Sequence, residues 1–216
     1  MTMKRFEGRS VIVTGAAGAI GRAIAKRFAA EGAAVCVSDL KAEGAEAVAE
    51  EIRLMDGNAF GCGVDVTQTA DVAAMAERVL AECGKIDILV NNAGGSAGLF
   101  GRLSRFRDAG EEVWSRVLDL NLHGTLRCIR AVLNPMIERR YGRIVSIASI
   151  AAAVGILDRV DYSAAKGGIV SLTKALAMEV GGYGVTVNSV SPGAIARRPT
   201  DSIPGGTYVG RMGTPE

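Results

Sequence analysis

The sequence of 216 residues predicts an α/β fold in which helices cover both faces of a doubly wound parallel sheet, giving three layers. Three observations support this prediction. Short β-branched runs alternate with longer amphipathic stretches. The runs are apolar almost throughout, as expected of strands that are buried on both faces. Glycines gather where the runs end, at the positions that need tight turns. We expect the crossover connections between the strands to be right-handed.

The expected elements alternate along the whole chain. In the first half we expect strands at 10–14, 33–39, near 59–66 and at 86–91, and helices at 19–31, 42–55 and near 70–82. In the second half we expect a long helical stretch within 111–140, a strand at 143–149, a helix from about 162 to 180 and a strand at 185–190. No internal repeat or linker interrupts this alternation, so we expect one domain over residues 1–216.

The composition favours a compact domain that binds a small molecule. Residues of the AVILMFWYC group make up 49% of the chain, charged residues make up 22%, and the formal net charge is +2. This balance gives no electrostatic reason to expect nucleic acid or a membrane surface as a partner. The N-terminus lacks the apolar region of a secretory signal, and Ser149 and Gly155 interrupt the most apolar stretch. We therefore expect a cytoplasmic protein without a membrane span.

Cysteine and histidine are placed unfavourably for a metal site. Cys36, Cys62, Cys83 and Cys128 lie far apart without a CxxC pair, and His123 is the single histidine. Zinc sites need several such ligands at close spacing, so we expect no metal. The apolar run around Cys36 favours buried, reduced thiols in a reducing compartment.

A glycine-rich turn between the first strand and the first helix points to a bound phosphate. Gly15, Gly18 and Gly21 let the backbone turn tightly, and the helix that follows presents free N–H groups to an anion. Glycine spacing alone is equally compatible with an ordinary turn. The second strand, however, ends at Asp39, whose carboxylate can accept from ribose hydroxyls and repels a 2′-phosphate. With the uncharged Leu40 beside it, this favours NAD over NADP.

Polar and small residues also stand at the ends of the third and fourth expected strands. Asp65 and Val66 end the third expected strand, and residues 91–94 end the fourth. A carboxylate such as Asp65 can accept from an adenine amino group, while Ala93 and Gly94 let a cofactor pass close to the backbone. Ligands of doubly wound sheets bind outside the carboxyl ends of the strands, so a dinucleotide lying across the sheet is expected.

The catalytic candidates lie in the second half of the chain. Tyr162 and Lys166 are four residues apart and therefore share one helical face. A phenol ionises near pH ~10, and a neighbouring ammonium favours its phenolate form. Ser149, at the same edge of the sheet, offers a hydroxyl to a substrate oxygen. Asn121 is the remaining polar candidate, although asparagine inside a helix often bonds only to nearby backbone.

Taken together, these motifs resemble the ordered motif set of the short-chain dehydrogenase/reductase family, from residue 9 to about 195. The resemblance implies a Rossmann-type fold and hydride exchange between an alcohol carbon and nicotinamide. It implies that Tyr162 is the general acid/base, Ser149 positions the substrate oxygen, Lys166 binds the nicotinamide ribose, and Asn121 holds a water that links Lys166 to solvent. The implied cofactor contacts are Gly15, Gly18, Ile20, Gly21, Asp39, Leu40, Asp65, Val66, Asn92, Ala93, Gly94, Tyr162, Lys166, Pro192, Gly193 and Ile195.

The sequence departs from the family pattern in three places. Alanine stands at position 19, where the family has a glycine, and Gly18 lies one place earlier. Arg197 stands where the family often has a threonine that contacts the nicotinamide amide. The resemblance also implies a further helix and strand beyond Glu216. Family members are usually tetramers, and we expect a tetramer or a dimer here.

Alternative functions remain open at this point. One is an NADP-dependent ketoreductase similar to 3-oxoacyl carrier protein reductases, and another is a cofactor-binding protein without catalysis. A third is a serine hydrolase, because Ser96 lies in a GxSxG sequence and Asp119 and His123 follow in hydrolase order. Arginines at positions 102, 105, 107, 197 and 198 are interpreted either as the border of an anionic substrate site or as ordinary surface.

Overall fold

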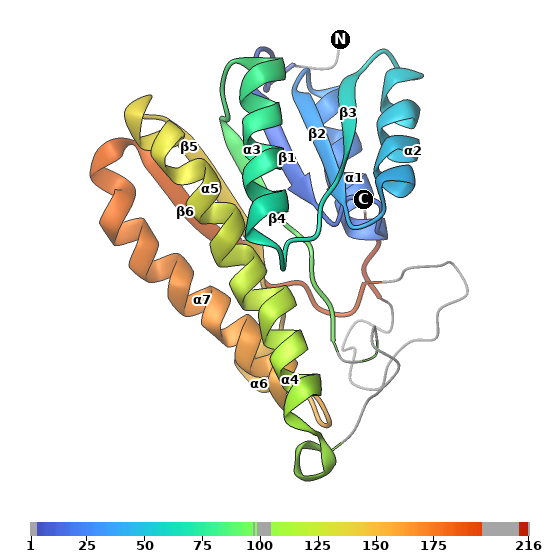
Figure 1. Ribbon diagram of the computed structural model, residues 1–216, viewed down its shortest axis with the longest axis vertical. Helices are drawn as coiled ribbons and strands as arrows, with labels where there is room; N and C mark the ends of the chain where they lie inside the picture. The colour runs from blue at the N-terminus through green and yellow to red at the C-terminus, as the bar shows by residue number, and fades with distance from the viewer. Residues whose placement is uncertain (1–3, 97, 99–104, 196–211, 216) are drawn as a thin grey trace.

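The protein is built on one six-stranded parallel sheet with the strand order β3-β2-β1-β4-β5-β6 (Figure 1). The computed structural model describes residues 4–96, 98, 105–195 and 212–215. The strands are β1 (Ser10–Thr14), β2 (Ala34–Asp39), β3 (Asn58–Gly63), β4 (Ile88–Asn91), β5 (Gly142–Ile147) and β6 (Val185–Val190). The order reverses between β1 and β4, which is the point where doubly wound sheets bind their ligands. The predicted fold class is therefore confirmed.

The helices connect these strands as the sequence predicts. They are α1 (Ala19–Ala30), α2 (Ala42–Arg53), α3 (Thr69–Cys83), α4 (Glu111–Leu118), α5 (Gly124–Glu138), α6 (Ala151–Val154) and α7 (Val160–Val180). Short 3-10 segments lie at Phe106–Asp108 and Gly181–Tyr183. The predicted ends of the long helices differ from these bounds by at most two residues.

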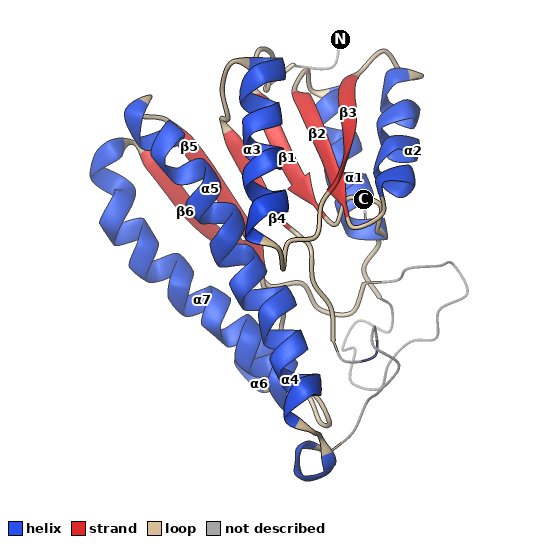
Figure 2. Ribbon diagram, viewed as in Figure 1, coloured by secondary structure: helices blue, strands red, loops and turns tan. Residues whose placement is uncertain are grey.

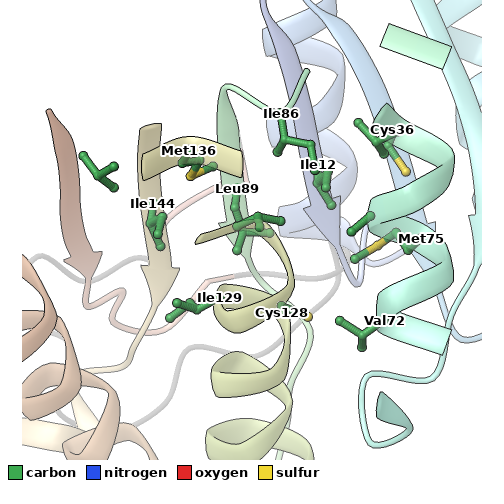
Figure 3. Close-up of a cluster of buried hydrophobic side chains, with 14 of the residues drawn as sticks. Ile12, Cys36, Val72, Met75, Ile86, Leu89, Cys128, Ile129, Met136 and Ile144 are labelled. Atoms are coloured by element: carbon green, nitrogen blue, oxygen red, sulfur yellow. The ribbon is translucent and has the colours of Figure 1, made fainter. Parts of the chain in front are cut away.

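Two hydrophobic clusters bind the helices to the opposite faces of the sheet. On one face, α1 and α2 pack through small side chains such as Ala25 and Ala49 against valines of β1 and β2. On the other face, α3, α5 and α7 pack over Ile12, Leu89 and Ile144 (Figure 3). Figure 2 shows these three helices in front of the sheet and α1 behind it. Because both faces of β1 are covered, all five of its residues are buried.

The last two strands differ from the prediction that strands are buried on both faces. In β5, buried and half-buried residues alternate, and in β6 the exposed Thr186 and Asn188 flank the buried Val187. The buried apolar side chains of both strands, Ile144, Val185 and Val187, belong to the cluster under α5 and α7. Among the described residues, no helix packs on the opposite face of β6, so this strand follows the pattern of a half-covered sheet.

The predicted long helical stretch is continuous, but the helix type changes in its middle. A π-helical turn at Asp119–His123 separates α4 from α5. One extra residue per turn rotates the side chains that follow, and such turns often occur at functional sites. Asn121 lies within this turn, so the change of helix type sets the direction in which its amide points.

The expectation that the thiols are buried was partly wrong. Cys36 and Cys128 are buried, but Cys62 and Cys83 are half-buried, because they lie at the ends of β3 and α3, where the covering is incomplete. All four thiols are free.

Within the described ranges, no helix has the length and apolar content needed to cross a bilayer. Nor do His, Cys, Asp and Glu side chains gather there in a group that could hold a metal ion.

Candidate active site at the carboxyl edge of the sheet

The turn between β1 and α1 requires glycine at two of its three positions. Gly15 has a φ of +62°, and a Cβ there would lie 2.8 Å from the Cα of Ala93. A Cβ on Gly21 would lie 2.4 Å from the carbonyl oxygen of Gly15. Gly18 differs, because its φ is −75° and an added Cβ would meet its nearest neighbour at 3.4 Å. The close packing of turn, helix and β4 therefore depends on Gly15 and Gly21.

The amino end of α1 has the properties of an anion site. Gly18 is the N-cap and offers no side chain to the first N–H groups, and the first helical turn contains no acidic residue. These N–H groups lack partners within the helix and carry its positive dipole end. Ala19 begins the helix and Ile20 follows it. The turn thus fits the pyrophosphate of a dinucleotide, and the alanine at position 19 leaves the helix start intact.

The carboxylate of Asp39 lies directly against this turn. Its Oδ2 accepts a hydrogen bond of 2.9 Å from the backbone N–H of Ala17. Leu40, the next residue, exposes 66% of its surface. The bond fixes one carboxylate oxygen beside the glycine-rich turn, where the ribose of an adenosine would lie, and leaves the second oxygen available.

Thr14 and Asn92 join the ends of β1 and β4. The Thr14 hydroxyl oxygen accepts from the backbone N–H groups of Asn92 and Ala93, both at 3.1 Å. The Asn92 amide nitrogen donates to the carbonyls of Thr14 at 3.0 Å and Gly15 at 2.9 Å. This network brings Ala93 against Gly15 and fixes the relative position of the two central strand ends.

Asp65 and Val66 lie beyond the third strand, not at its end as predicted. β3 stops at Gly63, and Asp65 bends into a turn in which its carboxylate accepts from the backbone and hydroxyl groups of Thr67 at 2.9 and 2.7 Å. Asx turns of this kind compete with continued strand pairing. The Val66 side chain is 5% exposed and packs in the core, so at this position only the backbone faces the edge.

Asn121 holds the chain segment that follows β4. Its amide nitrogen donates to the carbonyls of Gly95 at 2.7 Å and Val117 at 2.8 Å, and its Oδ1 accepts from the Gly95 N–H at 3.0 Å. The side chain is fully buried. A Cβ on Gly94 would lie 2.5 Å from this Oδ1 and 3.3 Å from Lys166 Nζ, so glycine is needed for this close approach. Both amide hydrogens and Oδ1 are therefore engaged by backbone groups.

Tyr162 and Lys166 lie near the start of α7, one helical turn apart. Lys166 is 4% exposed, and its Nζ donates to the Ile147 carbonyl at the end of β5 at 2.7 Å. The same Nζ lies 5.6 Å from the centre of the Tyr162 ring. Burial lowers the pKa of Lys166 to about 8, because the charged form loses solvation. The structure therefore places the Lys166 ammonium, whose pKa is lowered, close to the half-buried phenol of Tyr162.

Ser149 lies two residues beyond β5, whose last residue is Ile147 and not Ser149 as predicted. It is 9% exposed, and its hydroxyl oxygen accepts from the Ala151 N–H at 3.1 Å, at the start of α6. That short helix, absent from the sequence prediction, packs against α7. The bond fixes the hydroxyl oxygen and leaves its hydrogen free to donate.

The segment after β6 also lies at the carboxyl edge of the sheet, next to Ser149. The Pro192 carbonyl accepts from the Ile150 N–H at 3.0 Å, which ties this segment to the residue after Ser149. Gly193 is exposed, and Ile195 pairs with Gly213 in a short parallel bridge. Arg102, Arg197 and Arg198 lie outside the described residues. Arg105 and Arg107 are exposed, and Arg107 pairs with Asp108 at 3.4 Å.

The hydrolase alternative finds no support in the geometry. A nucleophile elbow places its serine at a sharp turn directly after a strand. Ser96, by contrast, lies five residues beyond Asn91, the last residue of β4. His123 Nδ1 lies 3.2 Å from Asp119 Oδ1 within the same π-helical turn, with more than half of the histidine side chain exposed. These two residues form a local surface pair.

Several contributors to the site escaped prediction because they act through backbone atoms. The carbonyls of Ile147 and Gly95 and the N–H of Ala17 carry no residue-type signal. Thr14 ends the first predicted strand, but its hydroxyl contacts with β4 depend on the pairing of strands far apart in sequence.

The fold and the site together define a dinucleotide-binding α/β protein with a tyrosine–lysine pair beside the cofactor edge. The family model for short chain dehydrogenases matches residues 9–203. The chain belongs to this family, whose members are dehydrogenases and reductases that act on CH–OH and keto groups.

Named relatives and solved structures agree with this assignment. The chain is 44% identical over 188 residues to D-threitol dehydrogenase of Mycolicibacterium smegmatis, covering 87% of this chain and 70% of the relative. It is 39% identical over 190 residues to the 3-oxoacyl-acyl-carrier-protein reductase FabG of Escherichia coli, covering 88% and 75%. A 7α-hydroxysteroid dehydrogenase in complex with NADH and 7-oxo glycochenodeoxycholic acid superposes with a TM-score of 0.89 at 32% identity, covering 98% and 84%.

Proposed function

We propose that the protein is an NAD(H)-dependent oxidoreductase that exchanges a hydride between a secondary alcohol or ketone and nicotinamide. The observation that carries this proposal is the buried Lys166 ammonium, held by the Ile147 carbonyl at 2.7 Å and lying 5.6 Å from the Tyr162 ring. A phenol in this position can take up and release a proton beside the carbon that is oxidised or reduced.

The choice of NAD rests on Asp39. Its carboxylate lies against the glycine-rich turn through the bond to Ala17, and Leu40 offers no cation to a 2′-phosphate. A fixed negative charge accepts hydrogen bonds from a diol and repels a phosphate at the same place. The bound NADH in the 7α-hydroxysteroid dehydrogenase, a relative by structure, supports the same choice.

We assign the cofactor to the edge formed by the carboxyl ends of the strands. The amino end of α1, with Gly15, Gly18, Ile20 and Gly21, would hold the pyrophosphate, and Asp39 and Leu40 the adenosine ribose. The backbone and side chains that would contact the rest of the dinucleotide are Asp65, Val66, Asn92, Ala93, Gly94, Tyr162, Lys166, Pro192, Gly193 and Ile195. When bound, the nicotinamide supplies the hydride acceptor or donor.

The chain's own residues would move the proton and orient the substrate. Tyr162 would take the proton from the alcohol during oxidation and return it to the oxygen during reduction. Ser149 would donate its free hydroxyl hydrogen to the substrate oxygen, since its own oxygen already accepts from Ala151. Lys166 would stabilise the phenolate, and Asn121, whose Oδ1 accepts from the Gly95 N–H, would hold the loop after β4 and a water that links Lys166 to solvent.

A screen of NAD and NADP against a panel of secondary alcohols, polyols and ketones tests the proposal. Absorbance at 340 nm reports reduction or oxidation of nicotinamide, and calorimetric titration reports cofactor binding without turnover. We expect binding and turnover with NAD. Binding without turnover on any substrate would favour a non-catalytic cofactor-binding protein, and binding of neither dinucleotide would end the proposal.

An NADP-dependent ketoreductase is the second candidate, and the identity of 39% with FabG favours it. The two candidates differ in the residue that meets the ribose. Preference for NADP in the same titrations would select the ketoreductase and would mean that Lys41, two residues after Asp39, outweighs the carboxylate.

A further inference from the structure

Cys62 lies in an environment that differs from those of the other three thiols. It is the fifth of the six residues of β3 and is half-buried. Cys36 pairs with Phe60 in the register of β2 and β3, so Cys36 and Cys62 point to the same face of neighbouring strands. Cys36 belongs to the hydrophobic cluster under α3, in which Figure 3 also labels Met75, and Cys62 packs against that cluster.

A guanidinium from α3 is fixed beside this pair. Arg78 Nη1 donates to the Gly61 carbonyl at 2.9 Å, and its Cζ lies 4.9 Å from the centre of the Phe60 ring. Phe60 and Cys62 share one face of β3, so the cation that stacks on Phe60 also lies on the side of Cys62. These two contacts fix the otherwise flexible Arg78 side chain, so its positive charge stays on the side of the thiol.

The charges around Cys62 favour its thiolate. The hydrogen bond from the Cys36 thiol lowers the pKa of Cys62 to about 6, and the charge and hydrogen bond of Arg78 act in the same direction. Burial and the Asp71 carboxylate on α3 act against them. Asp71 is itself held by the Asp65 N–H at 3.2 Å.

Cys83 provides a comparison within the same protein. It is half-buried like Cys62, yet it ends α3 next to Glu82 and close to Asp87. Burial and the Glu82 charge raise its pKa, with Lys85 opposing them. Cys128 is buried among apolar side chains, which raises its pKa to about 12. Exposure alone therefore does not distinguish Cys62 from Cys83, whereas the neighbouring charges do.

We propose that Cys62 is a covalent modification site for soft, uncharged electrophiles of the α,β-unsaturated carbonyl class. The thiolate sulfur of Cys62 adds to the β-carbon and forms a C–S bond. The C=C π electrons then form a double bond between the α-carbon and the carbonyl carbon, and the C=O π electrons move to the oxygen. The resulting enolate then takes a proton from water. Partial exposure at the end of β3 lets a small electrophile reach the sulfur, and Arg78 stabilises the attacking anion.

N-ethylmaleimide, an electrophile of this class, tests the proposal on the full chain. The rate of adduct formation at each cysteine is followed by peptide mass spectrometry between pH 4.5 and 8. We expect Cys62 to react at least about tenfold faster than Cys83 at pH 6, because far more of it is thiolate. We expect the Cys62 rate to reach half of its maximum near the pKa of about 6. Equal rates at the two cysteines would overturn the proposal, and this comparison needs no variant.

A matched pair of arginine variants tests the part played by Arg78. Arg53 also donates to a β3 carbonyl, that of Ala59 at 3.0 Å, but it comes from α2 on the opposite face. We expect Arg78→Gln to slow labelling of Cys62 at pH 6 by about fivefold or more, since the stabilising charge is lost. Arg53→Gln should leave the rate unchanged. An unchanged rate in Arg78→Gln, or an equal loss in both variants, would contradict the assignment.

Discussion

Lys166 Nζ donates a hydrogen bond of 2.7 Å to the backbone carbonyl of Ile147, the last residue of β5. This bond fixes an ammonium of α7 to the carboxyl end of the sheet, at the edge to which the glycine-rich turn and Asp39 also belong. Because the side chain is almost completely buried, its flexible stem has one position. The tyrosine one turn earlier on the helix is thereby placed against a fixed positive charge.

Replacing Tyr162 by phenylalanine should separate cofactor binding from catalysis. Removal of the hydroxyl deletes the proposed proton carrier but keeps the ring that packs near Lys166. We expect kcat to fall at least about a thousandfold, while the Kd for NAD changes little. Tyr183→Phe, at a tyrosine that is 46% exposed beyond α7, is the control and should keep full activity. Retained turnover in Tyr162→Phe would rule out the acid/base role.

Asp39→Asn should weaken the discrimination between NAD and NADP. The asparagine oxygen can still accept from the Ala17 N–H, so the turn keeps its bond while the charge disappears. Combined with Leu40→Arg, this change should lower the ratio of the Kd for NADP to the Kd for NAD at least about tenfold, which corresponds to ~1.4 kcal/mol. Calorimetric titration measures both constants, and Leu40→Arg alone is the control. An unaltered ratio in the double variant would mean that Asp39 does not contact the ribose.

Gly21→Ala and Gly18→Ala should differ sharply in stability. A methyl group on Gly21 would approach the Gly15 carbonyl oxygen at 2.4 Å and Asn92 Nδ2 at 2.6 Å, whereas one on Gly18 has an ordinary contact at 3.4 Å. We expect Gly21→Ala to lower the free energy of unfolding by about 2 kcal/mol or more, since backbone must move. Gly18→Ala should cost less than about 1 kcal/mol. Urea unfolding measures both values, and equal losses would argue against the close packing of this turn.

Because Lys166 is buried, the free energy of unfolding should increase as the pH rises above 7. Its pKa is lowered to about 8 in the folded state from its ordinary value of 10.5. Below pH 8 both the folded and the unfolded chain carry the proton. Between the two values the unfolded chain binds more protons, so raising the pH favours the folded state. From pH 7 to pH 9.5 this contribution amounts to about 2 kcal/mol.

Lys166→Met should remove that contribution. The quantity to compare is the free energy of unfolding of the unaltered protein minus that of Lys166→Met. We expect this difference to increase by about 2 kcal/mol between pH 7 and pH 9.5. Lys174→Met, at an exposed lysine of the same helix, should show no such shift. A constant difference across this range would show that Lys166 titrates near its ordinary value.

Much of the architecture could be predicted because local pattern and tertiary environment agree. β1 and β6 begin and end at the predicted residues, since β-branched runs bounded by glycine and polar residues have one reasonable interpretation. The prediction was weaker where tertiary contacts decide. β3 stops at Gly63 because Asp65 forms its own turn, and the π-helical turn around Asn121 leaves no periodic signal in the sequence.

The sequence by itself determined the order of strands and helices, the glycines of the first turn and the residue types that carry the proposed chemistry. Tertiary structure alone decided which of these groups meet. The pairing of Lys166 with the Ile147 carbonyl, of Asp39 with Ala17, and of Asn121 with Gly95 joins segments 19 to 26 residues apart through backbone atoms. Every residue type except proline has the same backbone N–H and C=O groups, so only the packing of helices on the sheet can select the partner.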